Sequence, residues 1–155
     1  MLALWSRTTL AALGLAVLPP DSSPLPANPS HSPGPRRVTI VAREYTFDAP
    51  DTLPAGPTVF RLENRGHRSH ELVIFAARTG VSAADMLGAT NAEERRSMAD
   101  PPVGVLFAPI GHPVSAELSA TLEAGRWYIL FCGVRDSVGM PLHFAIGMVD
   151  SIYAR

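Results

Sequence analysis

Four side chains of metal-binding type stand at spacings that could bring them together. The only cysteine of the chain, Cys132, is followed after ten residues by His143, and Met148 comes after four more. His70 stands much earlier, at the start of an apolar run. The two sulfur donors suit a soft cuprous ion, and imidazoles suit both oxidation states of copper. The sequence therefore predicts a site for one copper ion, with His70, Cys132, His143 and Met148 as ligands.

These residues also allow other interpretations. A buried cysteine at the end of a strand is ordinarily a small core residue, and a methionine is more often packing than ligand. His67, inside the turn before His70, is the competing first ligand, and His112 is a weaker loop candidate. Zinc is a poor alternative metal, because its usual ligands do not include methionine.

Short β-rich runs bounded by turn residues dominate the chain. About seven strands are expected, with one helical insertion inside residues 81–99 that has plausible N-caps at Ser82 and Asn91. This order predicts an all-β fold, an antiparallel two-sheet β-sandwich with Greek-key connections, over residues 36–155. The clearest runs are residues 38–42, 58–63, 71–76, 114–122, 126–132 and 148–153.

The ligand candidates fall at the ends of these strands. Period-two alternation puts His70 on the face of its strand that carries Leu72 and Ile74, and Cys132 on the face that carries Leu130. Each candidate thus ends an inward-facing row, where the core would shield a metal. His143 and Met148 are five positions apart and cannot share a face of one straight strand. Residues 144–147 should therefore form a loop or bulge.

The N-terminal part has features typical of a targeting segment followed by a linker. Arg7 precedes an apolar run over residues 8–18, which has the length of a secretory signal core and is short for a bilayer span. Seven prolines then fall within residues 19–35, as in a semi-rigid linker. We expect residues 1–18 to be a signal peptide or membrane anchor and the protein to be exported, to the periplasm of a bacterium.

Export makes the solitary cysteine informative. Exported proteins fold in oxidising compartments, where cysteines are usually paired. Cys132 has no possible partner within the chain, and a free thiol there is open to oxidation unless it is buried or ligated. A role as a metal ligand would explain why the chain has a cysteine and why it has only one.

The motifs together resemble those of the cupredoxin, or plastocyanin-like, family. The resemblance rests on Asn-x-Gly before His-Glu-Leu, on Glu-x-Gly-x-Trp leading into Cys132, and on Gly-x-Pro-x-His-x4-Met at residues 139–148. It implies three equatorial ligands, His70, Cys132 and His143, and an axial Met148. The ten residues between Cys132 and His143 are a departure from small electron carriers, and resemble the longer loop of copper nitrite reductases.

These features favour one-electron transfer outside the cytoplasm, with a redox partner protein of unknown identity. A copper storage or delivery protein and a metal-free interaction module are the alternatives. A closed four-ligand site leaves no position for a substrate, so neither an enzyme nor a small-molecule substrate is expected. The net charge of −1 and the lack of a basic tract argue against nucleic acid as a partner.

Overall fold

The computed structural model of the protein describes residues 34–112 and 114–155. The predicted export segment and most of the predicted linker lie outside these residues. The described chain forms β1 (Arg36–Arg43), β2 (Thr46–Asp48), β3 (Thr52–Leu53), β4 (Gly56–Asn64), β5 (His70–Ala77), α1 (Ala83–Gly88), α2 (Ala92–Ser97), β6 (Ala99–Ala108), β7 (Val114–Leu122), β8 (Trp127–Phe131), the 3-10 turn η1 (His143–Ile146) and β9 (Val149–Ala154).

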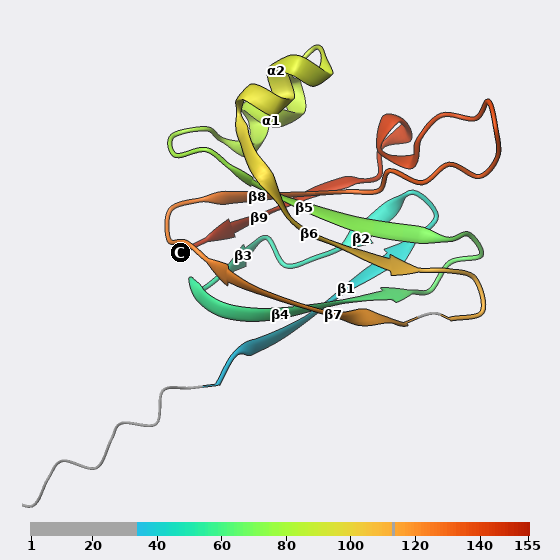
Figure 1. The fold of residues 1–155 in the computed structure, drawn as a ribbon, viewed down its shortest axis with the longest axis horizontal. Helices are drawn as coiled ribbons and strands as arrows, with labels where there is room; N and C mark the ends of the chain where they lie inside the picture. Colours follow the sequence, from blue (N-terminus) through green and yellow to red (C-terminus); the bar gives the residue numbers. More distant parts are fainter. Residues whose placement is uncertain (1–33, 113) are drawn as a thin grey trace, which may run out of the picture. The chain divides into compact units, whose positions relative to one another are not determined.

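The strands form two sheets that pack face to face (Figure 1). One sheet has the order β2-β1-β4-β7, and the other has the order β3-β9-β8-β5-β6. Alternating side chains of both sheets meet in one core, in which Ile40, Phe60, Leu72 and Leu130 are fully buried. The predicted two-sheet β-sandwich is confirmed.

The sheets are mixed, whereas the sequence predicted antiparallel ones. Five strand pairs are antiparallel, but β1 pairs with β4, and β3 with β9, in parallel. Parallel neighbours need a crossover connection. The chain supplies one by leaving the first sheet after β2, adding β3 to the second sheet and returning as β4.

Three strands were not predicted from the sequence. β2 and β3 are only three and two residues long. β6 contains Pro101 and Pro102, which normally argue against a strand. Its place at the edge of the sheet tolerates them, because an edge strand has one side that makes no ladder hydrogen bonds. The register with β5 also shifts next to Pro102.

The helical insertion lies where the sequence placed it and carries the predicted caps. The side chain of Ser82 accepts a hydrogen bond from the Asp85 backbone N–H, and that of Asn91 accepts one from Glu94. Met86 of α1 packs with Ile129 in a small cluster separate from the main core. The insertion therefore covers part of the outer face of the second sheet. No helix among the described residues is long and apolar enough to cross a membrane.

Candidate metal centre

Strand pairing brings His70 and Cys132 to one end of the sandwich. His70 begins β5 and Cys132 directly follows β8, and these strands are antiparallel neighbours, with Val73 opposite Phe131. The loop after Cys132 extends from this end and returns through η1 (Figure 1). It closes on itself through hydrogen bonds from the His143 N–H to the Val134 carbonyl (2.8 Å) and from the Phe144 N–H to the Cys132 carbonyl (2.9 Å).

Three predicted ligands converge in a buried cluster. One donor atom from each of His70, Cys132 and His143 lies within 4.8 Å of the other two. The Cys132 Sγ is 4.0 Å from Nδ1 of His70 and 3.4 Å from Nδ1 of His143. At most 1% of each residue is exposed. The cluster is therefore closed to solvent at its donor atoms.

Met148 lies beside this cluster in the chain and in the core. η1 ends at Gly147 with φ 109°, a left-handed conformation that favours glycine, so residues 144–147 are not strand, as predicted. Met148 is fully buried in the same core cluster as Cys132. Its carbonyl accepts a hydrogen bond from the Cys132 N–H (3.2 Å), and its own N–H donates to the His143 carbonyl (3.0 Å).

The competing histidines lie elsewhere. His67 and His112 are exposed, and neither belongs to the only group of three or more candidate metal-binding side chains that the described residues form. The structure thus favours His70 over His67 as the first-strand ligand.

The residue after His70 shapes the surroundings of the thiol. The backbone N–H of Glu71 donates to the Cys132 Sγ (3.4 Å), and the Glu71 carboxylate accepts from the Gly133 N–H (2.9 Å). A Cβ at Gly133 would collide with that carboxylate, so a larger residue there would displace the Glu71 side chain. Burial raises the pKa of the Cys132 thiol above its ordinary 9.0. A thiol of this kind is protonated at neutral pH until a cation displaces its proton.

The donor set fits copper by its chemistry. Two imidazoles, one thiol and a neighbouring buried thioether match the ligands that soft or borderline copper prefers. The cluster contains no carboxylate, the donor type expected of calcium or magnesium. The buried Nε2 of His70 has no hydrogen-bond partner among the described residues, and its Nδ1 faces the sulfur.

His143 is held from its other side by the long loop. Its Nε2 lies 3.2 Å from the Asp136 Oδ1, while its Nδ1 faces Cys132. The other Asp136 oxygen accepts from the Tyr45 hydroxyl (2.7 Å) and lies 3.8 Å from the Arg68 guanidinium. The Tyr45 hydrogen bond, followed by that of His143, lowers the pKa of Asp136 below 3.8. An ionised carboxylate thus orients a candidate ligand, as carboxylates commonly do around metal sites.

The β1–β2 turn organises both loops at this end. Tyr45 has φ 58°, a left-handed conformation that costs an aromatic residue about 1–2 kcal/mol. Its ring also makes an edge contact with His143, with centroids 4.9 Å apart. The neighbouring Glu44 carboxylate accepts hydrogen bonds from the backbone N–H groups of His67 and Arg68. One turn therefore supports the segment before His70 and the loop before His143.

Sequence reasoning missed this supporting set. Asp136 and Tyr45 are 91 residues apart, and no motif or periodicity connects them. Asp136 is one of several polar residues in a loop whose path cannot be read from strand patterning. The signal available was its position between two candidate ligands.

Asn64 should be the main anchor of the turn before His70. Its buried amide donates to the carbonyls of Arg68 (2.6 Å) and Ala108 (2.9 Å), and its Oδ1 accepts from the Gly66 N–H (2.9 Å). Asn64→Ala leaves those groups unpaired, and we expect the free energy of unfolding to fall by about 1–3 kcal/mol. Chemical denaturation measures this. Asn91→Ala, which removes an exposed cap, should cost less, and equal losses would contradict the assignment.

The metal-free protein should lose stability on mild acidification. Burial, then the charge of His143, lowers the pKa of His70 below 6.5. The unfolded chain then binds more protons than the folded one as the pH falls through 6.5, so stability decreases in that direction. Carboxylates with lowered pKa values, such as Glu44, lose their contributions only below about 4.5.

Thermal melting of the metal-free protein between about pH 7.5 and pH 5.5 tests this within the histidine range. His70→Gln should flatten the dependence, and the exposed His112→Gln should leave it unchanged. A flat wild-type profile would show that His70 protonates without cost in the folded protein.

Comparisons with known proteins gave matches among solved structures alone. No family model matches the chain, and no curated sequence is detectably similar to it. Among solved structures, reduced rusticyanin is 20% identical, with a TM-score of 0.48, over 77% of this chain and 80% of that one. Auracyanin A, a "blue" copper protein from Chloroflexus aurantiacus, is 17% identical over 79% of this chain and all of that one, with a TM-score of 0.42. Plastocyanin from Dryopteris crassirhizoma is 17% identical over 76% and 99%, with a TM-score of 0.40.

The fold is assigned on the strand order and on the packing of the two sheets described above. It is a two-sheet β-sandwich with mixed sheets and a short helical insertion.

Proposed function

We propose that this chain is a mononuclear copper protein that transfers single electrons. The main support for this proposal is that the buried side chains of His70, Cys132 and His143 come together, with their donor atoms within 4.8 Å of one another. Met148, buried in the same cluster of the core, is the proposed axial ligand. Copper bound there would supply a one-electron couple between its cupric and cuprous states.

The burial of the site supports transfer of electrons over catalysis on a substrate. His70, Cys132 and Met148 are fully buried and His143 nearly so. A substrate would have no approach to an ion held by these four side chains. We therefore propose that the protein is not an enzyme and that its partner is another redox protein.

We further propose that the protein works outside the cytoplasm, in the periplasm or tethered to a membrane. The apolar run over residues 8–18 supports this location, and so does the single cysteine. A fractionation of cells with antibody against residues 34–155 would test it. Recovery of the protein in the cytoplasm would contradict the proposal.

Cupric titration of the purified protein tests the function. We expect one copper per chain and an intense visible band, because a thiolate ligand donates charge to a cupric ion. The coloured form should be bleached by reductant and restored by oxidant without loss of copper. A colourless stoichiometric complex would instead indicate storage or delivery, and absence of binding would indicate a metal-free interaction module.

A further inference from the structure

The outer face of the second sheet carries an apolar groove of about 490 Å³. Its floor is formed by β5, β8 and β9, one wall by the helical insertion and the other by η1. In Figure 1 the insertion and the η1 turn both stand above this sheet, and residues of both line the groove. Its lining is mostly apolar and includes Phe75, Phe131, Phe144 and Leu87, and its charged members are Arg95 and Arg96.

The groove is separate from the metal centre. Phe131 and Cys132 are adjacent in the chain, so their side chains point to opposite faces of the sheet. Cys132 points into the core, whereas Phe131 lines the groove. Phe144, which follows His143, makes an edge contact with Phe131 (centroids 5.6 Å apart), and Phe75 stacks on Phe131 (5.4 Å). These three phenylalanines therefore form one aromatic cluster in the lining of the groove.

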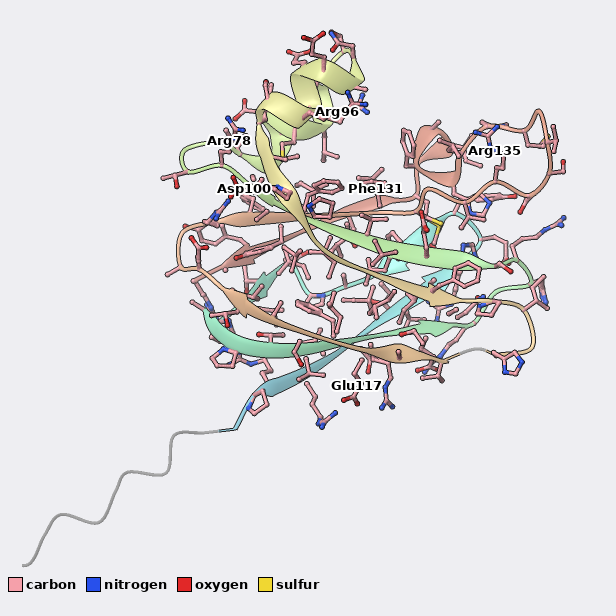
Figure 2. All side chains as sticks on the ribbon, viewed as in Figure 1. Arg78, Arg96, Asp100, Glu117, Phe131 and Arg135 are labelled. Atoms are coloured by element: carbon pink, nitrogen blue, oxygen red, sulfur yellow. The ribbon has the colours of Figure 1, made fainter. Side chains whose placement is uncertain are left out.

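Charge in the groove has one sign. Arg95 and Arg96 of α2 belong to its lining, and none of the lining residues is acidic. The side chain of Arg95 is held by a hydrogen bond to the Ala89 carbonyl (3.0 Å). The carboxylate of Glu94, on the same helix, accepts hydrogen bonds from the backbone N–H (2.8 Å) and the hydroxyl (2.9 Å) of Thr90. Figure 2 shows Arg96 on the insertion above Phe131 on the sheet.

We propose that this groove binds a small molecule that has an aromatic, apolar body and one anionic group. Its volume is within the range of small-molecule sites, which are mostly apolar with a few placed polar groups. Aromatic rings would pack on Phe131 and Phe144, and the anion would meet Arg96 at the wall. The exposed Leu87, at 52%, is available to such a ligand.

Two fluorescent probes of similar shape test both halves of the proposal. Anilinonaphthalene sulfonate has an aromatic body with an anionic group, and phenylnaphthylamine has the body alone. We expect the anionic probe to bind the folded full chain once, and several times more tightly than the neutral probe. Partly unfolded proteins also bind such dyes. A thermal melt should therefore show that the protein is folded during the titration, and the number of probe molecules bound per chain should be measured.

Substitutions then locate the binding. Leu87→Glu places a carboxylate in the apolar lining and should weaken the anionic probe by about tenfold or more. Arg96→Gln should weaken it by about two- to fivefold, as for a partly exposed ion pair, and leave the neutral probe unchanged. Arg43→Gln, which removes an equal charge from β1 of the other sheet, should leave the affinity for both probes unchanged.

Each other outcome overturns the proposal. Equal binding of the two probes would show that the anion is not recognised, and no effect of Arg96→Gln would show that Arg96 does not meet it as proposed. Absence of binding, or binding unaffected by Leu87→Glu, would show that the groove is not the site. A dimer that light scattering detects and that Leu87→Glu dissociates would assign this face to a second copy of the chain. All measurements can be made without copper, so the result is independent of the proposed electron transfer.

Discussion

Cys132→Ser is expected to abolish the intense visible band of the cupric protein completely while the sandwich remains folded. Cys132 supplies the only thiol of the chain, and its sulfur lies between the two imidazoles, 3.4 Å and 4.0 Å from their Nδ1 atoms. A serine hydroxyl fills nearly the same volume. It is a much poorer donor to copper, because thiolate is the soft ligand in this set.

The measurement is the visible spectrum of the cupric variant beside its far-ultraviolet circular dichroism. Met148→Leu is the matched control, since it removes the other sulfur from the same core. A weak axial methionine tunes the redox potential of such a site. The control should therefore keep the colour and shift the reduction potential upward. Colour that survives in Cys132→Ser would exclude the thiol as a ligand.

The convergence of the ligands was predictable because strands carry two of them. Alternation placed His70 and Cys132 at the ends of inward-facing rows, and Leu72 and Leu130 on those rows are indeed fully buried. Antiparallel pairing of β5 with β8 then brings the two row ends together. Side chains of β5 and β8 alternate between the main core and the smaller cluster on the outer face of the sheet, and that local rule was enough for this part of the site.

What the sequence could not predict depends on contacts between distant segments. β6 was missed because its prolines suppress the strand pattern, and only its edge position makes them harmless. The parallel β1–β4 pair depends on the path of the chain between sheets. The hydrogen bonds that join Asp136 to Tyr45 and His143 arise from the folding of a ten-residue loop, which has no repeating pattern.

That loop leads to the second large effect, which is expected from Asp136. The carboxylate lies 3.2 Å from Nε2 of His143, on the side of the ring away from the sulfur. Its negative charge favours the more highly charged cupric state. Asp136→Asn keeps an oxygen acceptor and removes the charge, so we expect the reduction potential to rise by on the order of tens of millivolts. Asp136→Ala also frees the ring, and copper affinity should fall by about 10- to 100-fold.

Voltammetry of the copper protein and competition with a chelator measure the two effects separately. Glu93→Gln removes an equal charge from the exposed surface of α2 and is expected to change neither quantity. The two Asp136 variants distinguish charge from positioning, because only the alanine variant loses the acceptor that holds His143. If Asp136→Asn left the potential unchanged and Asp136→Ala bound copper as tightly as the wild type, the carboxylate would have no influence on the site. The ten-residue loop would then serve only to join Cys132 to His143.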